Sequence, residues 1–294
     1  MKKLILSAAV FMFLLLVGTN NASAAEQISI DEAHFPEMCI REEVRNIHDK
    51  NHDGILSVEE QEAVTDFWVY KFCDKDDYPT EYLNAPCPEY TMDDLTLDFK
   101  GMEYFTNLKN IHLDCSYAHV YVKGLKQRDK YDIKVKNFES LSKCLRLETI
   151  LWFRINESFL LDDGRAVDVD VSKWSQLKNL SLYISNKNVT FTLGNKKLKT
   201  LHAGGNNIKL KNISGCPKLR ELSLECKNIK SLNLSKCRNL RQLSVAGVRG
   251  IKTICVYNDK LTYVPAKKNA SVNMKKVWHK NKLSIYAQKG TKIL

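Results

Sequence analysis

The second half of this 294-residue chain repeats itself at a fixed interval, and no other feature restricts its fold as strongly. Five nine-residue units begin at positions 174, 195, 216, 237 and 258, a period of 21, and they read WSQLKNLSL, NKKLKTLHA, CPKLRELSL, CRNLRQLSV and NDKLTYVPA. Two earlier units, FTNLKNIHL (105–113) and CLRLETILW (144–152), fit the same frame after longer connections. Seven units in one frame make chance leucine spacing a poor explanation of the pattern.

The spacing L-x-x-L-x-L at such a period is that of a leucine-rich repeat, in which each unit forms one coil with one short strand. A single coil cannot bury its leucines, so neighbouring coils stack and their strands form a parallel sheet with a spacing of roughly 4.8 Å. We therefore predict an α/β fold, a right-handed solenoid over residues 105 to 266. Its seven strands are predicted to centre near Ile111, Ile150, Leu180, Leu201, Leu222, Leu243 and Val264.

Other positions of the repeat also carry predictions. Asn207 and Asn228 stand where these folds use an inward-pointing asparagine to bind turn carbonyl groups. Two coils, 114–143 and 154–173, are longer than the rest, and the segment LKQRDKYDIKVKNFESLSK within the first is a candidate for a short helix. Because irregular insertions project from a regular scaffold, we expect these coils to be the variable part of the molecule.

The chain begins like an exported protein. Two lysines precede an apolar run, and Ala22-Ser23-Ala24 is a small-x-small cleavage sequence, so residues 1–24 are predicted to be a secretory signal peptide. Later apolar runs are too short to cross a bilayer, which predicts no transmembrane segment. The C-terminal sequence YAQKGTKIL has no wall-sorting pattern. We expect a secreted, extracellular protein that is either released or held at the cell surface by its charge.

Residues 49–60, DKNHDGILSVEE, match the twelve-residue calcium loop of an EF-hand. The oxygen donors at positions 1, 3, 5, 7, 9 and 12 are Asp49, Asn51, Asp53, the carbonyl of Ile55, Ser57 and Glu60, and Gly54 occupies the turn position. The pattern predicts a Ca²⁺ site; the alternative is an EF-like loop that serves only as a turn. EF-hands normally pair and no second loop is present, so the expected dissociation constant is on the order of 10⁻⁴ to 10⁻³ M.

The loop is flanked by two segments with helical patterning. Ile40, Val44 and Ile47 share one face upstream, and Ala63, Val64 and Phe67 are apolar downstream, which predicts a helix–loop–helix. A solenoid needs its first coil covered, so this unit is predicted to be an N-terminal cap. The expected organisation is a cap over 25–70, an insert over 71–98, a solenoid over 99–270 and a C-terminal cap over 271–294.

Charge is divided unevenly along the chain. Residues 26–100 carry 20 acidic and 6 basic side chains, whereas residues 101–294 carry 14 acidic and 37 basic ones. A basic column, Lys109, Lys178, Lys199, Arg220 and Arg241, shares one position of the repeat. Such a surface favours an anionic extracellular polymer or an acidic protein, and its alternative role is to keep one edge solvated. No nucleic-acid motif is present, so nucleic acid is not an expected partner.

Strand positions that alternate with the buried leucines form the candidate binding face. Most of them are small or polar, and the sequence predicts contacts from this face and from the basic column. The candidate ligand-binding residues are His112, Phe153, Tyr183, His202, Lys178, Lys199, Arg220 and Arg241. The alternative for each is a merely solvated sheet face. Motifs of hydrolases, metalloproteases and phosphate-binding enzymes are absent, and Asp162-Asp163 with Asp168 and Asp170 fit a solvated loop better than a catalytic pair, so we predict no enzyme.

Nine cysteines permit at most four disulfides and leave at least one thiol unpaired. Cys216 and Cys237 share one repeat position and are predicted to point inward as a small apolar ladder. Cys73 and Cys87 flank the insert and are the preferred disulfide.

These features resemble the internalin-like group of secreted bacterial leucine-rich repeat proteins. The resemblance is carried by residues 35–64 (FPEMCIREEVRNIHDKNHDGILSVEEQEAV), residues 99–113 (FKGMEYFTNLKNIHL) and the regular coils of period 21. It implies an EF-hand-like cap, an extracellular setting and a binding role. The insert at 70–97 is longer than this group leads us to expect, and the wall anchor of many members is absent. The predicted function is recognition of an extracellular macromolecule, either a protein or an anionic glycan or wall polymer; the alternative is a calcium-dependent docking or assembly module.

Overall fold

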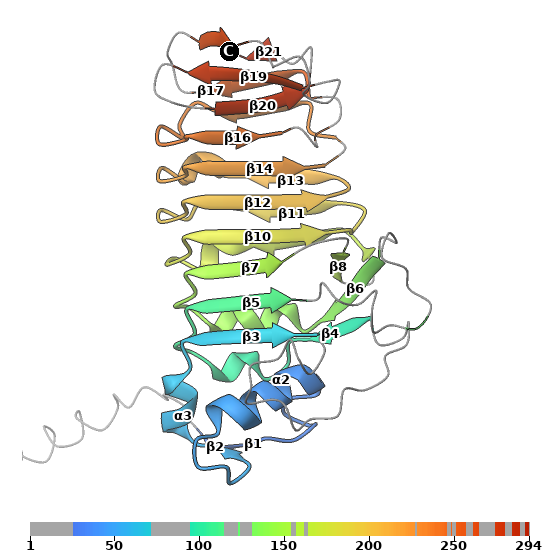
Figure 1. Ribbon diagram of the computed structural model, residues 1–294, viewed down its shortest axis with the longest axis vertical. Coiled ribbons are helices and arrows are strands. Elements are labelled where there is room, and N and C mark those ends of the chain that lie inside the picture. Colours follow the sequence, from blue (N-terminus) through green and yellow to red (C-terminus); the bar gives the residue numbers. More distant parts are fainter. Residues whose placement is uncertain are drawn as a thin grey trace, which may run out of the picture.

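The computed structural model describes residues 26–71, 95–114, 123, 131–153, 157–161, 164–226, 228–245, 248, 251–256, 261–264, 274–279, 284–288 and 292–293. These residues wind into an elongated stack of strands (Figure 1). Helices lie at the N-terminal end of the stack, and the C-terminus lies at the opposite end. The signal sequence, Cys73, Cys87 and Asp162-Asp163 lie outside the described residues.

A long parallel sheet runs the length of the stack (Figure 1). Its strands, in spatial order, are β3 (Asp66–Tyr70), β5 (Asn110–Asp114), β7 (Thr149–Phe153), β10 (Asn179–Ile184), β12 (Thr200–Gly205), β14 (Glu221–Glu225) and β16 (Gln242–Ser244). Leu180 pairs with Leu201, Leu201 with Leu222 and Leu222 with Leu243, so each strand pairs with the next at the period of the sequence repeat. The first six predicted strand positions lie in this sheet, as expected of a leucine-rich repeat solenoid.

The leucine columns form the core. Leu180, Leu201, Leu222 and Leu243 point inward from the strands and are fully buried. Leu177, Leu198 and Leu219, in the turns before the strands, are fully buried as well. Burying one such side chain is worth roughly 1.5–3 kcal/mol, so each added coil is held mainly by the leucines that it places against its neighbours.

A second layer of shorter strands covers the core. It consists of three parallel groups: β4 (Thr96–Asp98), β6 (Tyr131–Lys136) and β8 (Glu157–Leu161); β9 (Val167–Asp170), β11 (Val189–Thr192) and β13 (Ile208–Lys211); and β15 (Ser231–Leu234), β17 (Thr253–Val256) and β21 (Lys292–Ile293). Within the described strands of this layer, only β8 also pairs with the long sheet, where Phe159 lies opposite Ile184 of β10.

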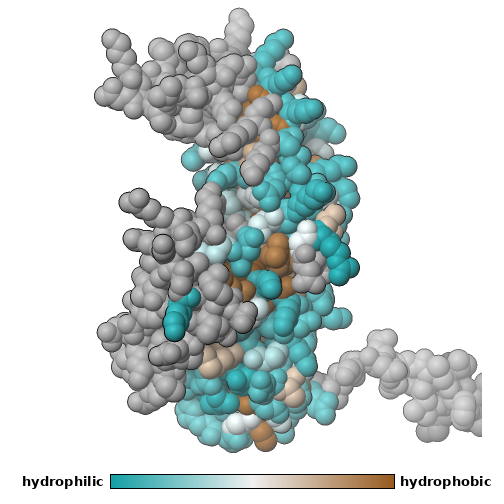
Figure 2. Space-filling view, turned by 90° about the vertical axis from the view of Figure 1, so that its right-hand side faces the viewer, coloured by the Kyte–Doolittle hydropathy of each residue, from teal (hydrophilic) through white to brown (hydrophobic). Residues whose placement is uncertain are grey.

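Short 3₁₀ helices connect the second layer to the next turn of the coil. They are η5 (Met102–Tyr104), η6 (Phe138–Lys143), η8 (Val171–Lys173) and η9 (Ile213–Gly215). The segment predicted to hold a short helix contains η6, but its preceding residues form strand β6. On the side of the molecule at which the strands of the long sheet end, the described residues are mostly hydrophilic, with an apolar area near mid-height (Figure 2).

The prediction of a seventh parallel strand at Val264 is wrong. Strand β18 (Leu261–Val264) pairs antiparallel with β19 (Met274–His279), which in turn pairs antiparallel with β20 (Ser284–Gln288). It is β20 that continues the parallel sheet, with Ile285 opposite Leu243. In the unit that begins at 258, Pro265 follows Val264 directly, and proline has no N–H to donate to a central ladder, which fits the place of β18 at the sheet edge.

The N-terminal cap contains two short helical segments around the predicted calcium loop. Helix α2 (Met38–Glu43) continues as the π-helical turn η1 (Val44–His48), and α3 (Val58–Ala63) follows the loop. Strand β1 (Ile28–Ser29) pairs antiparallel with β2 (Ile55–Leu56) inside the loop.

The prediction that Phe67 continues the second helix is wrong. Phe67 lies in β3, where it pairs with Ile111, and Val69 pairs with Leu113. Both Phe67 and Val69 are fully buried, which is the alternation of a strand. The cap therefore runs directly into the first strand of the long sheet, and the sheet begins well before residue 99.

Candidate binding surfaces

Hydrogen bonds from its own backbone close the loop of residues 49–60. The Oδ2 atom of Asp49 accepts from the Gly54 N–H at 2.9 Å, and Oδ1 of Asp53 accepts from the Ile55 N–H at 2.8 Å. Oδ1 of Asn51 accepts from the Asp53 N–H at 3.1 Å. Gly54 has a φ of 80°, a left-handed conformation that favours glycine. The predicted ligands are thus drawn into one tight turn.

Glu60 joins the two ends of this loop. Its Oε1 atom accepts from the Lys50 N–H at 2.7 Å, and its Oε2 atom accepts from the Ser57 N–H at 2.9 Å. Ser57 caps helix α3 by accepting from the Glu60 N–H at 3.2 Å, which completes a capping box. Burial by itself would raise the pKa of Glu60, but the hydrogen bonds from Ser57, Lys50 and Asn51 together hold that pKa below its usual value.

One carboxylate oxygen in the loop has no hydrogen-bond partner. Asp49 is 1% exposed, and its Oδ1 atom is buried and unpaired. Within the described residues, no three His, Cys, Asp or Glu side chains gather closely enough to hold a metal by themselves. The predicted ligands of the loop are instead oxygen atoms of several kinds. They come from two aspartates, an asparagine, a serine, a glutamate and a backbone carbonyl. That oxygen-only set fits Ca²⁺ and lacks the nitrogen and sulfur ligands of a zinc site.

The N-terminal strand occupies the place beside the loop that a second EF-hand would take. Ile28 pairs with Leu56 and Ser29 with Ile55, and the Ile30 N–H donates to the Gly54 carbonyl at 2.9 Å. Leu56 is fully buried as a result. This strand was not predicted, although the alternation of Ile28 and Ile30 is its signal.

A buried ion pair joins the start of α2 to the end of β3. The Lys71 ammonium lies 2.7 Å from Oε1 of Glu37, and the two side chains are 6% and 8% exposed. Oε2 of Glu37 accepts from the Asp98 N–H at 3.2 Å, so one carboxylate connects the start of α2, the end of β3 and strand β4. This contact was not predicted because neither residue carries a local signal for it.

Aromatic rings fill the rest of the junction between cap and solenoid. His48 stacks on Phe67 with ring centroids 5.2 Å apart, and Phe35 stacks on Phe105 at 6.2 Å. Gly101 has a φ of 97°, and a Cβ atom there would lie 2.3 Å from the Phe35 ring, so this position requires glycine. Burial lowers the pKa of His48 to about 4, with a further contribution from Lys50.

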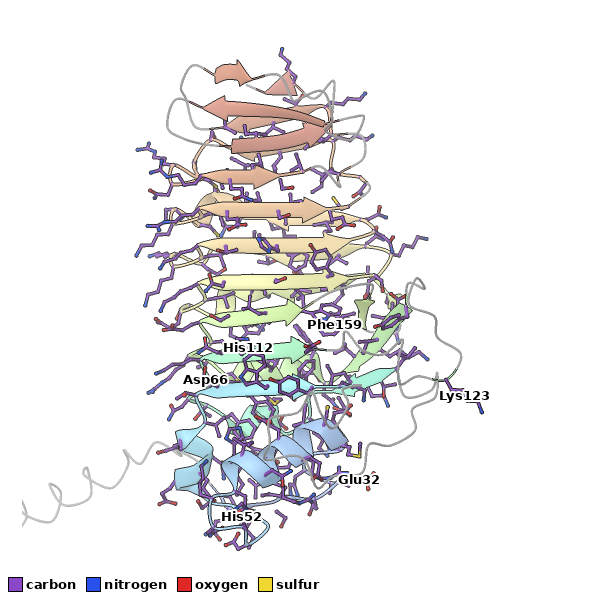
Figure 3. The ribbon with its side chains drawn as sticks, viewed as in Figure 1. Glu32, His52, Asp66, His112, Lys123 and Phe159 are labelled. Carbon is purple, nitrogen blue, oxygen red and sulfur yellow. The ribbon has the colours of Figure 1, made fainter. Side chains whose placement is uncertain are left out.

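The outward face of the long sheet divides into an aromatic part and a polar part. Near the cap, Trp68 stacks on His112 with centroids 4.0 Å apart and lies parallel to Tyr70 at 5.5 Å. Figure 3 shows His112 and Asp66 on neighbouring strands of this part. His112 was a predicted ligand residue, but Trp68 and Tyr70 were missed because the segment was assigned to a helix.

Farther along the sheet the face is small and polar. His202 lies 3.1 Å from Oε1 of Glu221 on the next strand. The ring of the candidate residue Tyr183 lies over the next strand, because a Cβ atom on Gly204 would be 1.9 Å from it. The backbone of Phe153 pairs with Asp114 in the sheet, and its side chain is outside the described part.

The basic column exists but is interrupted. From Lys178 to Arg241, the N–H of each column residue donates to the carbonyl of the one a coil earlier at 2.7 Å, so the backbones stand in line. Glu148 occupies the same ladder between Lys109 and Lys178, and the Lys178 ammonium lies 2.5 Å from its Oε2 atom. That hydrogen bond, with Lys109 and Lys197 nearby, lowers the pKa of Glu148. Lys199, Arg220 and Arg241 continue the column beyond this pair.

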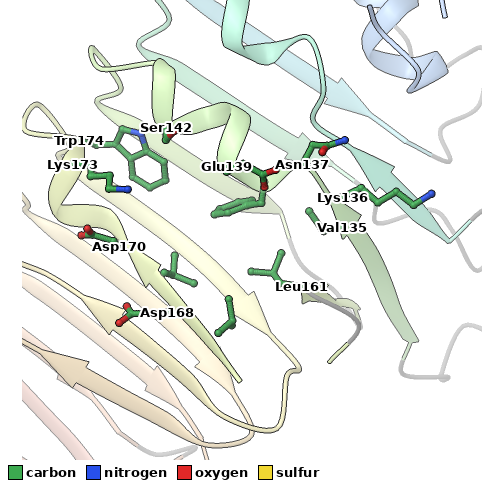
Figure 4. A pocket seen from close by; sticks show the side chains of 13 residues that line it. Val135, Lys136, Asn137, Glu139, Ser142, Leu161, Asp168, Asp170, Lys173 and Trp174 are labelled. Carbon is green, nitrogen blue, oxygen red and sulfur yellow. The ribbon is translucent and has the colours of Figure 1, made fainter. Parts of the chain in front are cut away.

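A cavity of about 540 Å³ opens in the second layer between β6 and η6 on one side and β9 and η8 on the other (Figure 4). Apolar side chains such as Val135, Leu161 and Val169 line it together with Asp168 and Asp170. Oδ2 of Asp168 pairs with the Lys211 ammonium at 2.9 Å, and Asp170 caps η8 through Ser172. Both aspartates therefore have structural partners, but they lie in strand β9 and not in the predicted solvated loop.

The inward asparagines differ from those predicted. Asn228 is exposed and Asn207 is half-buried, whereas Asn186 and Asn195 are buried. Asn195 Nδ2 donates to the Val171 carbonyl at 2.6 Å, and Asn186 Nδ2 donates to the Leu161 carbonyl at 2.5 Å. Asn186 shares the repeat position of Asn207 and Asn228, and Asn195 shares that of Cys216 and Cys237.

The described cysteines are all free thiols. They are Cys39, Cys144, Cys216, Cys226, Cys237 and Cys255, and all but Cys255 are buried. The other three of the nine cysteines, among them Cys73 and Cys87, lie outside the described residues. Cys216 and Cys237 point inward as predicted, and burial raises the pKa of Cys237 to about 11.

Comparison with known proteins adds little to these observations. No protein-family model matches the chain, and no curated protein does either. Among solved structures, an internalin C2 from Listeria monocytogenes is similar, with 16% sequence identity over 79% of this chain and 98% of that one, at a TM-score of 0.24. At this TM-score the likeness supports no residue-level comparison. The class of the protein, a leucine-rich repeat solenoid, rests on its own parallel strands and buried leucine columns. In the described residues, no helix is long and apolar enough to cross a membrane.

Proposed function

We propose that this chain is a binding protein that holds an extracellular protein against the outward face of the long sheet, and that it is not an enzyme. The observation that carries the proposal is the continuous face of β3, β5, β7, β10, β12, β14 and β16, whose register aligns outward side chains in columns across the strands. Aromatic residues at one end of such a face are the kind that dominate binding energy in protein interfaces.

The size of the face also favours a macromolecule. Seven strands about 4.8 Å apart, each about 17 Å long, cover on the order of 500 Å² before side chains are counted. That is comparable with the roughly 800 Å² that each partner buries in a standard protein interface. A small molecule would need a concave site, and the described cavity lies in the opposite layer.

Export and calcium belong to the same proposal. Residues 1–24 would direct the chain out of the cell, where retention by charge is the alternative to release. Ca²⁺ would be held by Asp49, Asn51, Asp53, the Ile55 carbonyl, Ser57 and Glu60, and would stabilise the cap. The unpaired, buried Oδ1 atom of Asp49 supports this assignment.

A matched pair of substitutions tests the proposed face. Ser223 lies on the outward face of β14, and Ser231 lies exposed on β15 in the second layer. The purified chain is screened against an array of extracellular proteins, and each hit is measured again with Ser223→Arg and Ser231→Arg. We expect Ser223→Arg to weaken the complex at least about tenfold, because a bulky charge is placed in the contact, and Ser231→Arg to leave it unchanged. The opposite ranking would place the partner on the second layer.

The second candidate function is a calcium-dependent docking or assembly module. It is favoured by two large apolar side chains exposed on the cap, Met38 at 37% and Ile55 at 39%. If this function is correct, Ile55→Ser should abolish partner capture by the full chain, capture should require Ca²⁺, and Ser223→Arg should have no effect.

A further inference from the structure

We infer that the edge formed by the turns before β10, β12, β14 and β16 is a second binding surface, which takes a linear phosphate polymer lying along the axis of the stack. This basic edge comprises residues 174–178, 195–199, 216–220 and 236–241, which contain nine lysines and arginines and no acidic residue. It is separate from the sheet face, and the inference does not depend on the protein partner proposed above. Figure 3 shows nitrogen-tipped side chains projecting along this edge.

The four turns stand in line because they are bonded to one another. The Lys199 N–H donates to the Lys178 carbonyl, the Arg220 N–H to the Lys199 carbonyl and the Arg241 N–H to the Arg220 carbonyl, each at 2.7 Å. Side chains repeat the alignment, since Lys197 donates to Gln176 of the turn before and Asn239 Nδ2 donates to the Pro217 carbonyl at 2.8 Å. The charges therefore form a straight strip rather than a scattered set.

Beyond Lys178, the cations of this strip are exposed to solvent. Lys196, Lys199, Lys218 and Arg220 are exposed, and within the described part of the chain no carboxylate forms an ion pair with any of them. One coil earlier, by contrast, Glu148 neutralises Lys178. Like charges aligned at such short intervals repel one another, and a polyanion would remove that cost by replacing the counterions that otherwise screen it.

The density of charge indicates the class of partner. Without Lys178, which Glu148 neutralises, eight cations on four turns about 4.8 Å apart amount to roughly one per 2.4 Å of axis, of the same order as the ~1.7 Å per charge of duplex DNA. A polymer with one carboxylate per sugar ring carries its charges farther apart and would leave most of these cations unmatched. A chain of phosphate groups matches them better.

The residue types on the strip argue against nucleic acid. Proteins that bind single strands place aromatic rings on which the bases stack. The aromatic residue of these four turns, Trp174, is 3% exposed, and its indole N–H donates to the Leu141 carbonyl at 3.0 Å. Recognition by charge alone suits a polymer that has phosphates and no bases.

The test measures binding of the full chain to inorganic polyphosphate by fluorescence anisotropy, between roughly 50 and 200 mM salt. All samples contain chelator, because polyphosphate would otherwise compete for Ca²⁺. The strip variant is Lys199→Gln/Lys218→Gln/Arg220→Gln. The control, Lys209→Gln/Lys230→Gln/Lys252→Gln, removes the same charge from exposed positions on the side of the second layer.

Each lost phosphate contact should reduce the slope of log affinity against log salt by about 0.7, so the strip variant should lose about two units. We expect at least a tenfold weaker complex at low salt for the strip variant, and a slope change below about 0.7 for the control. A charge-preserving variant, Lys199→Arg/Lys218→Arg/Arg220→Lys, should bind like the wild type, which shows that the fold tolerates change there.

Four results would overturn the inference. They are no binding of polyphosphate by the wild type, an equal loss in the control variant, equally tight binding of polygalacturonate with the same number of charges, and tighter binding of oligothymidylate than of polyphosphate. Either of the first two results would show that the basic edge is not the binding surface, and either of the last two would assign it a different class of partner. None of them bears on the protein-binding face, which is tested through Ser223.

Discussion

The cap, residues 26–71, and the middle coils, residues 174–245, bury different kinds of side chain. Among the described residues, the buried polar or charged side chains of the cap are Glu37, Glu43, Asp49, Gln61 and Lys71, whereas the coils bury Ser181, Asn186 and Asn195. The coils depend on aliphatic columns that repeat from one turn to the next. The cap depends on single polar contacts between distant segments, each made once.

This difference predicts how damage spreads. In a stacked repeat each coil contacts only its neighbours, so a lost side chain loosens one interface and leaves the others intact. In the cap, removal of one residue of a buried ion pair leaves the other charge buried without its partner. This is costly because the remaining charge is kept away from water. The cap should therefore be the more fragile region towards single substitutions, although its apolar core is also well packed.

The largest effect is expected from Lys71→Ala. Removing the ammonium leaves the Glu37 carboxylate buried without its cation, which should cost about 3–5 kcal/mol of unfolding free energy. The exposed pair Lys211–Asp168 offers a control, and Lys211→Ala should cost less than about 1 kcal/mol. Urea unfolding of both variants checks the ranking. Equal losses would mean that the cap is not held by this pair.

A core substitution in the coils should come next. Leu222→Ala removes a fully buried side chain between β12 and β16 and should cost about 2–5 kcal/mol. Hydrogen exchange should show increased opening of β12, β14 and β16 while the cap keeps its protection. Opening of the cap in this variant would show that the two regions unfold as one unit, contrary to the local response expected of stacked coils.

The repeat made the coils predictable. Leu180, Leu201 and Leu222 recur at the period of the repeat, and stacking is the one arrangement that buries all of them, so pattern and structure agree. Where the pattern is local and degenerate, prediction failed. Ala63, Val64 and Phe67 fit a helix by spacing, yet Phe67 and Val69 also fit a strand, and pairing with Ile111 and Leu113 decides between the two.

Contacts between distant segments could not be predicted from the sequence. The pairing of Glu37 with Lys71 and the place of β20 beside β16 depend on how the chain returns to the sheet. The candidate loop ligands were predicted from spacing alone, because the EF-hand pattern draws its ligands from one short segment, and calcium binding stays a prediction. The outward face of the sheet was predicted only in part. Trp68 belongs to this face, but the sequence pattern placed it in a helix and not in a strand.

Calcium should act on the cap and spare the coils. If the ion binds only the native loop, then at 100 times the dissociation constant it should add about 2.7 kcal/mol to stability. Glu60→Gln should abolish most of that gain, whereas Glu59→Gln, an exposed neighbour on the same helix, should keep it. The measurement is thermal unfolding of each variant with Ca²⁺ and with chelator. The difference between the two conditions is compared across variants, so that a loss of the capping box, which affects both conditions, cancels. If the unfolding midpoint of the wild type is the same in chelator as in millimolar Ca²⁺, the loop serves only as a turn.

The smallest effect concerns the ion pair at the start of the basic column. The hydrogen bond from Lys178 holds the pKa of Glu148 below its usual value, so the folded state favours the carboxylate more than the unfolded chain does. Stability from this pair is therefore present above the unfolded pKa of about 4.5 and is lost as pH falls through the lower, folded pKa. Because both side chains are about one-third exposed, solvent screening should limit the loss to less than about 1 kcal/mol. The difference in unfolding free energy between wild type and Glu148→Gln should shrink between pH 6 and pH 3, and hydrogen exchange should place the change in β7 and β10. If the difference in unfolding free energy stays constant over that range, Glu148 acts by its shape and not by its charge. The ion pair at this edge would then not stabilise the coils.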